Sequence, residues 1–108
     1  MSIEKELHFL KVNAEKYAEA KGMAEYLKEF RKAKKAMLIN EAELKGRKTQ
    51  QERESYAYSH SEYIELLEGL KVAVIESERL RLLVKTAELQ IEHKKTMTMK
   101  EMAEMRLR

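Results

Sequence analysis

Cysteine, proline, tryptophan and aspartate are absent from this chain of 108 residues, and its only glycines are Gly22, Gly46 and Gly69. Without cysteine, the chain can form no disulfide framework, no thiolate zinc site and no cysteine nucleophile. Without proline and with few glycines, it lacks the turn residues that a fold of many short strands needs. The remaining class is all-α, and 75 of the 108 residues are the strong helix formers Ala, Leu, Glu, Lys, Arg, Met and Gln.

Long apolar runs are also absent. The longest, Ala36–Ile39 and Val72–Ile75, have four residues each, whereas a helix that spans a membrane needs about 20. The first residues show no apolar signal-peptide core behind a basic stretch. We therefore expect a cytoplasmic protein that does not associate with membranes.

Charged residues are abundant and mixed in sign. The 22 basic and 19 acidic residues give a net charge of +3, and their interleaving is typical of a solvated helical surface. The segment Lys28–Lys48 differs, since it carries eight basic and three acidic residues. It is either a solvated face or a surface for nucleic-acid phosphates. The candidate nucleic-acid contacts are Lys28, Arg31, Lys32, Lys34 and Lys35.

Apolar residues spaced by three and four predict helix one over about 3–55, with Ser2 as its N-cap. Asn40 with Glu43, or Gly46 followed by Thr49 with Glu52, could interrupt this helix, because each pair has the spacing of a capping arrangement. The predicted seam of helix one is Ile3, Leu7, Leu10, Ala14, Tyr17, Ala20, Met23, Leu27, Phe30, Ala33, Met37 and Leu44.

A turn is predicted over about 56–60, where helix formers become rare. Ser59 and Glu62 form a capping box, so helix two should begin near 60 and continue to about 95. Thr98 with Glu101 has the same spacing and predicts a separate short helix over about 99–106. The predicted seam of helix two is Tyr63, Leu67, Leu70, Val74, Leu80, Val84, Ala87 and Ile91.

These two helices match in length, each extending roughly 70–80 Å at about 1.5 Å per residue. Folding back at the turn would therefore pair them as a long antiparallel helical hairpin of coiled-coil type, a single domain over 1–108. The alternative is one unbroken rod of about 160 Å, which needs a partner along its whole length.

A second apolar stripe on helix two predicts self-association. Its residues, Val72, Ile75, Leu82 and Leu89, lie on a different sector of the helix from the predicted seam. One partner helix cannot cover both sectors, so we expect a twofold homodimer that forms a four-helix bundle. The alternative is that these residues widen the contact within the hairpin or are tolerated singly at the surface.

Two further groups have alternative interpretations. Tyr56, Tyr58 and Tyr63 crowd the predicted turn, where they either close the end of the hairpin or act as partner-binding anchors. The C-terminal methionines either pack against the start of helix one or form a docking surface for another protein. These methionines are Met97, Met99, Met102 and Met105.

Catalytic constellations are missing. His8, His60 and His93 have no second ligand at the spacing of a metal-binding bundle, so we expect no metal and no cofactor. Ser59 and His60 are only sequence neighbours, and there is no Gly-rich phosphate loop. We predict a non-enzymatic protein without catalytic residues, in which His60 helps helix two to start.

Three segments, Glu29–Leu38, Gln51–Leu67 and Glu76–Leu83, resemble a family of short proteins encoded by tailed bacteriophages and prophages, and the likeness covers most of 3–92. Members often have His-Pro-Glu-Tyr where this chain has His60-Ser-Glu-Tyr, and proline suits the first turn of a helix. They carry a C-terminal segment with tryptophan, which this chain replaces with His93-Lys-Lys-Thr-Met-Thr-Met.

The resemblance implies a phage origin, a location in the host bacterial cytoplasm and a place among early DNA-metabolism genes. It supplies no catalytic residues. We therefore expect a helical interaction protein, an accessory of phage DNA recombination or replication that acts through an unidentified protein partner. The alternative is an accessory that binds nucleic acid weakly and without sequence specificity through the basic segment of helix one.

Overall fold

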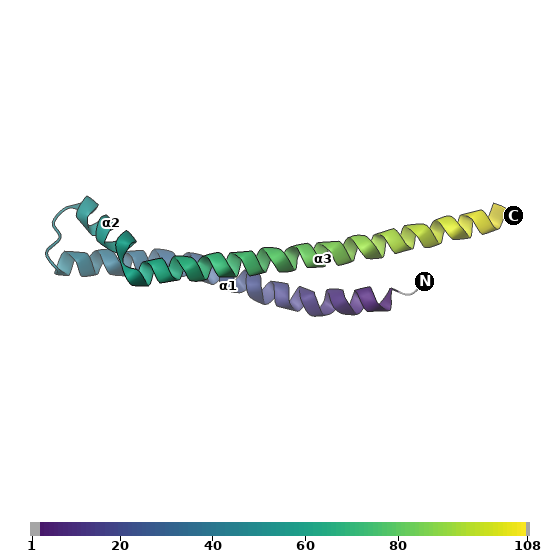
Figure 1. The fold of residues 1–108 in the computed structure, drawn as a ribbon, viewed down its shortest axis with the longest axis horizontal. Helices are drawn as coiled ribbons and strands as arrows, with labels where there is room; N and C mark the ends of the chain where they lie inside the picture. The colour runs from purple at the N-terminus through teal and green to yellow at the C-terminus, as the bar shows by residue number, and fades with distance from the viewer. Residues whose placement is uncertain (1–2, 108) are drawn as a thin grey trace. The chain divides into compact units, whose positions relative to one another are not determined.

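The computed structural model describes residues 3–107, which form three α-helices (Figure 1). Helix α1 covers Glu4–Leu44, α2 covers Gln50–Ser59 and α3 covers Ser61–Leu107, with 41, 10 and 47 residues. No strand occurs among the residues described. The prediction of an all-α protein is confirmed, whereas the predicted N-cap Ser2 lies outside the described residues.

The first helix ends at Leu44, so the prediction that it continues to about residue 55 is wrong. Gly46 has a φ of 89°, a left-handed conformation that residues with a Cβ rarely adopt. Its amide donates to the Glu43 carbonyl at 3.1 Å, and the Arg47 amide donates to the Ala42 carbonyl at 3.0 Å. These are the two hydrogen bonds of a Schellman motif, which ends a helix by satisfying its last carbonyls.

Helix α2 begins after Thr49, which is its N-cap. The hydroxyl of Thr49 accepts from the Glu52 amide at 3.1 Å, and the Glu52 carboxylate accepts from the Lys48 amide at 3.0 Å. Both amides would otherwise lack a partner at the start of the helix. Of the two interruptions considered, the one at Thr49 is real, and α1 passes through Asn40 unbroken.

A single residue, His60, separates α2 from α3 in place of the turn predicted over 56–60. Ser59 does not cap α3, because its hydroxyl donates to the Ser55 carbonyl at 2.7 Å inside α2. Instead, Nδ1 of His60 accepts from the Glu62 amide at 3.1 Å. The predicted capping box at Ser59 is therefore wrong, and the prediction that His60 helps the helix to start is confirmed.

The end of α3 also differs from expectation. The helix continues to Leu107, so the predicted end near 95 and the separate helix over about 99–106 are wrong. The Thr98 hydroxyl donates to the Lys94 carbonyl at 2.9 Å. A hydroxyl bonded back to its own helix in this way is not used as a cap.

The chain divides into two compact units. Unit 1 combines the described parts of Met1–Glu19 and Ser77–Arg108, and unit 2 is Ala20–Glu76. Unit 1 therefore contains the start of α1 and the larger part of α3, whereas unit 2 contains the end of α1, all of α2 and the start of α3.

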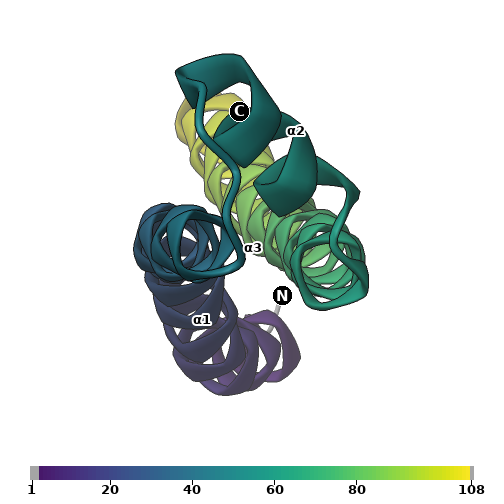
Figure 2. The same cartoon turned by 90° about the vertical axis from the view of Figure 1, so that its left-hand side faces the viewer.

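The core of unit 2 joins its three helices. Leu38 of α1, Ala57 of α2 and Tyr63 of α3 are 2%, 0% and 5% exposed, and Ile39 packs against them. Figure 2 shows α1, α2 and α3 from the side of α2. The short helix α2 is held by this cluster, since ten residues alone are too few for a stable helix in water.

In unit 1 the two helical segments run antiparallel. Ile3 lines one hollow with Met99, and Phe9 lines another with Gln90, so residue numbers rise along α1 as they fall along α3. The buried side chains described in this unit come from α3 and are Ser77, Leu80, Ala87 and Ile91.

The buried and half-buried residues of α3 follow one another at alternating intervals of three and four residues. This is the repeat of a coiled-coil seam. Leu83 is a further half-buried residue that does not belong to this repeat. The predicted seam included Leu67 and Val74, but these are 36% and 45% exposed, and Leu66 and Ala73 take their places. The observed seam positions are Tyr63, Leu66, Leu70 and Ala73 in unit 2 and Ser77, Leu80, Val84, Ala87, Ile91, Lys94 and Thr98 in unit 1.

Candidate interaction surfaces

The contact between the two segments of unit 1 is partly polar. Glu6 and Asn13 of α1 are half-buried where Leu7 and Ala14 were predicted to lie. The Glu6 carboxylate accepts from the Lys94 ammonium, and this hydrogen bond holds the pKa of Glu6 below its ordinary value. Because polar side chains occupy the seam, apolar ones are left outside it, and Leu7 is 46% exposed.

The four residues predicted for self-association lie exposed on α3. Val72, Ile75, Leu82 and Leu89 are 65%, 57%, 55% and 56% exposed. The last three follow one another at intervals of seven residues, each five residues after a seam position. Five residues carry a helix about 140° beyond a full turn, so these side chains lie away from the seam. Leu89 also lines a hollow with Glu6 of α1. We call Val72, Ile75, Leu82 and Leu89 the outer face of α3.

A second exposed apolar surface lies on α1 in unit 2. Met23, Tyr26 and Met37 are 54%, 63% and 56% exposed, and the rings of Tyr26 and Phe30 stack with centroids 6.0 Å apart. Sequence reasoning missed this surface, because it assigned Met23, Phe30 and Met37 to the seam. The available signal was the alternation of three and four that links Met23, Tyr26, Phe30, Ala33 and Met37.

The three candidate tyrosines divide between core and surface. Tyr63 is 5% exposed in the core of unit 2. Tyr58 lies edge-on against it and stays 46% exposed, with the Lys35 ammonium 4.7 Å from its ring centre. Tyr56 meets His60 edge-on, with centroids 5.6 Å apart. Tyr63 thus packs the fold, and Tyr58 presents a ring to solvent.

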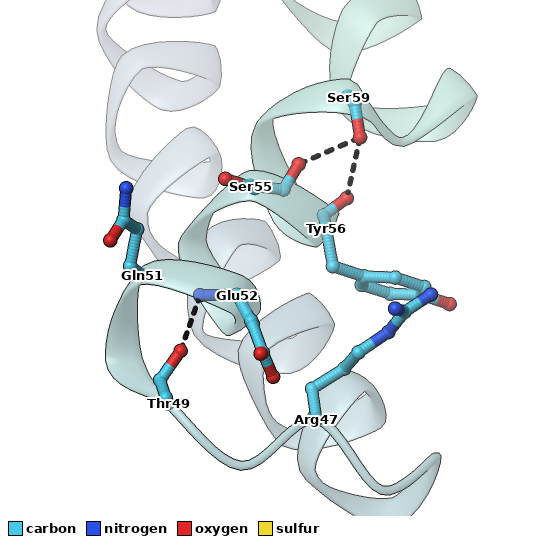
Figure 3. A pocket seen from close by; sticks show the side chains of 7 residues that line it. All are labelled: Arg47, Thr49, Gln51, Glu52, Ser55, Tyr56 and Ser59. Carbon is cyan, nitrogen blue, oxygen red and sulfur yellow. Dashed lines mark hydrogen bonds between the residues drawn. The ribbon is translucent and has the colours of Figure 1, made fainter.

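An open hollow of about 580 Å³ lies beside α2 (Figure 3). The Arg47 guanidinium lies 5.9 Å from the centre of the Tyr56 ring, and Lys45 donates to the Tyr56 hydroxyl at 2.9 Å. This hydrogen bond, aided by Glu41, raises the pKa of Lys45. Several polar groups that line the hollow form hydrogen bonds within α2 or with its N-cap. The hollow is therefore mainly a by-product of helix capping. Its lining residues are Arg47, Thr49, Gln51, Glu52, Ser55, Tyr56 and Ser59.

Two candidate nucleic-acid contacts form ion pairs within unit 2. Lys32 lies 3.3 Å from the Glu29 carboxylate on the same helix. The Lys34 ammonium lies 2.5 Å from the Glu62 carboxylate. This ion pair joins α1 to α3 and lowers the pKa of Glu62. A phosphate would have to compete with these carboxylates.

The other three candidate contacts differ in exposure. The Lys35 ammonium lies over one side of the Tyr58 ring, and the interaction with the Tyr58 hydroxyl raises the pKa of Lys35. Arg31 is half-buried and Lys28 is exposed. The basic segment therefore contributes to the structure of unit 2 through several of its cations.

The C-terminal methionines are only partly covered. Met99 lines a hollow with Ile3, and Met97 is 36% exposed. Met102 and Met105 are 52% and 71% exposed. The start of α1 therefore contacts the first part of this stretch and leaves the rest open.

No group of three or more side chains suited to hold a metal ion occurs within residues 3–107. None of the helices described is both long and apolar enough to cross a membrane. Comparisons of the chain with family models, curated proteins and solved structures give no match.

Proposed function

We propose that this chain is a non-enzymatic helical protein that acts by binding other protein chains, first of all a second copy of itself. The exposure of the outer face of α3, at 55% to 65% for each side chain, carries the proposal. In the proposed assembly each chain is a helical hairpin, and two hairpins pair through the outer faces of α3. Because these faces lie away from the seam, the four long helices form a layer in place of the four-helix bundle that the sequence predicted.

The exposed area of the chain supports the proposal. The chain exposes 8461 Å², whereas a compact monomer of 12.8 kDa exposes about 6,300 Å². The excess of about 2,200 Å² exceeds the roughly 800 Å² that each partner buries in an interface of standard size. The exposed surface is therefore large enough for a dimer contact and for a contact with a further partner.

We further propose that this further partner is a protein of phage DNA recombination or replication, in the cytoplasm of the bacterial host. The resemblance to short phage proteins that the sequence suggests over most of residues 3–92 supports this part of the proposal. The surfaces available to the partner are the Tyr58 ring and the side chains of Met23, Tyr26 and Met37 on α1.

Light scattering on a sizing column at tens of micromolar tests the self-association. The expected mass is twice the 12.8 kDa of one chain. Leu82→Glu combined with Leu89→Glu should give a monomer with unchanged helical circular dichroism, because the charges cannot be buried in a helix contact. Val74→Glu is the matched control, since Val74 is 45% exposed on the same helix but lies outside the outer face.

A wild-type chain that stays monomeric would overturn the self-association. The same conclusion would follow if the double variant stayed as dimeric as the Val74→Glu control.

A further inference from the structure

We infer that two copies of this chain pair antiparallel through α3, with Lys71 of one copy beside Glu92 of the other and Glu78 beside Lys85. The inference rests on the proposed self-association and adds its orientation and register. It follows from the charges that border the outer face of α3.

The outer face belongs to a longer stripe on α3. Its residues alternate by three and four, which is the spacing that lets a second helix pack in successive layers. Glu68 and His93 continue the spacing at the two ends, so the stripe has polar residues at its limits and four apolar residues between them, interspersed with Arg79 and Thr86. The central stripe residues are Val72, Ile75, Arg79, Leu82, Thr86 and Leu89.

One edge of this stripe carries four exposed charges at intervals of seven residues, and their signs alternate. They are Lys71, Glu78, Lys85 and Glu92. In a twofold antiparallel pair, the same edge of the two helices meets, and each contact between different residues occurs twice. Because the signs alternate along this edge, each charge of one copy can meet an opposite charge on the same edge of the other copy.

One register makes these contacts complementary. In this register Val72 of one copy packs at the same level as Leu89 of the other copy. Glu68 of the first copy lies level with His93 of the second. Lys71 and Glu92 both fall between these two layers, so opposite charges meet. Opposite-charge pairs at the edge of a helix contact set partner orientation and register.

The next layers follow in the same way. Ile75 of one copy packs at the same level as Thr86 of the other copy, and Arg79 of the first copy packs at the same level as Leu82 of the second. Glu78 and Lys85 both fall between these layers, which gives a second complementary contact. Each of the two contacts occurs twice in the dimer, because the axis relates them.

Other arrangements are disfavoured. Sliding the antiparallel pair by seven residues places Lys71 against Lys85 and Glu78 against its own copy, so like charges meet. A parallel pair in register places Arg79 against Arg79. Like charges in contact cost free energy, so the alternating edge selects against the shifted antiparallel pair, and Arg79 disfavours the parallel pair.

Side-chain details within the chain agree with this register. The Thr86 hydroxyl donates to the Leu82 carbonyl at 2.8 Å, so Thr86 can pack on Ile75 of the other copy without losing its hydrogen bond. Glu78 pairs with Arg81 at 2.9 Å, but its side chain is 55% exposed and remains accessible to Lys85 of the other copy.

Charge exchange tests the register. Lys71→Glu or Glu92→Lys alone should raise the dimer dissociation constant about tenfold at low salt, since each creates two like-charge contacts. The double variant Lys71→Glu with Glu92→Lys should recover to within about threefold of wild type. The matched control, Lys71→Glu with Glu88→Lys, has the same net charge and should remain weak. Sedimentation equilibrium measures all four variants.

A spin-label distance tests the orientation independently. The chain has no cysteine, so Lys95→Cys gives one labelled site per copy. In the antiparallel dimer the two labels should lie about 40 Å apart, at about 1.5 Å rise per residue. A parallel dimer would bring them within about 20 Å, given interaxial distances near 10 Å.

A dimeric mass with a short label distance, or without recovery in the double variant, overturns the antiparallel register and leaves self-association standing. A monomeric mass overturns both.

Discussion

The ring of Tyr58 meets the ring of Tyr63 edge-on, with centroids 5.6 Å apart and planes inclined by 76°. A half-exposed residue of α2 thereby packs on a buried residue of α3. Edge-to-face pairs contribute about 0.5–1.5 kcal/mol beyond the burial of the rings. Since Tyr63 also contacts the cluster with Leu38 and Ala57, it should matter more than Tyr58 for the stability of unit 2.

Replacing the two rings separately tests this ranking. We expect Tyr63→Ala to lower the free energy of unfolding by about 3–5 kcal/mol, because it leaves a cavity in the core. Tyr58→Ala should cost about 1 kcal/mol. Urea titration followed by circular dichroism measures both, and Tyr63→Phe is the control that keeps the ring. Equal losses at the two positions would contradict the packing described here.

Replacing Gly46 or Gly22 by alanine should change the stability of the protein in opposite directions. We expect Gly46→Ala to destabilise the protein by about 1–2 kcal/mol, because alanine resists the φ of 89° that ends α1. Gly22→Ala should stabilise it by up to about 1 kcal/mol, since Gly22 lies inside α1 and an added Cβ meets no atom within 4 Å. Thermal unfolding of the two variants measures the difference. A gain from Gly46→Ala would contradict the Schellman motif.

Proline should be accepted at position 61. Ser61 is the first residue of α3, where a proline removes no helical hydrogen bond. The preceding residue, His60, already has φ −67° and ψ 135°, which is the extended conformation required before proline. We expect Ser61→Pro to stabilise the chain by about 0.4–1 kcal/mol. Ser59→Pro is the contrasting control, because it lies inside α2 and should destabilise the chain.

The ion pair of Glu6 with Lys94 should make stability depend on pH. The Lys94 ammonium holds the pKa of Glu6 below its ordinary value of 4.5. A lowered carboxyl pKa stabilises the fold above the unfolded value, and this contribution is lost as the pH falls through the folded value. Lys94→Gln should therefore be less stable than wild type near neutral pH, and the difference should shrink below about pH 4.

Urea unfolding near pH 7 and near pH 3 measures this dependence. Lys95→Gln is the matched control, since Lys95 is the neighbouring exposed lysine and should show no such change. A deficit of Lys94→Gln that grew in acid would have the wrong sign.

Local signals in the sequence predicted the helical class and marked Thr49 as one of two candidate interruptions, although the predicted helix continued to about residue 55. Glycine and a threonine cap follow one another there, and both act through the backbone of a few residues, so no distant contact is needed to recognise them. The start of α3 was misassigned by one residue, because Ser59 and His60 can both accept from a first-turn amide. The choice depends on the Ser55 carbonyl, which binds the Ser59 hydroxyl.

The register of the seam could not be predicted from spacing. On α3, Leu66 and Ala73 alternate by three and four with their neighbours just as the outer residues Ile75 and Leu82 do with theirs. Hydrophobicity favours the larger side chains, yet the seam accepts Ala73 and other small or polar residues, whose size lets two helices approach closely. Choosing between the repeats requires knowing which helix lies opposite, and that information is not local.

The single-residue joint at His60 limits the insertions and deletions that this chain can accept. Adding one residue there would change the placement of α2 relative to α3 and move Ala57 within the cluster that it forms with Leu38 and Tyr63. The connection from Lys45 to Thr49 has several residues and an exposed surface, and loops of that kind tolerate altered length. Insertions and deletions in descendants of this sequence should therefore accumulate before α2, while the joint after it changes by substitution alone.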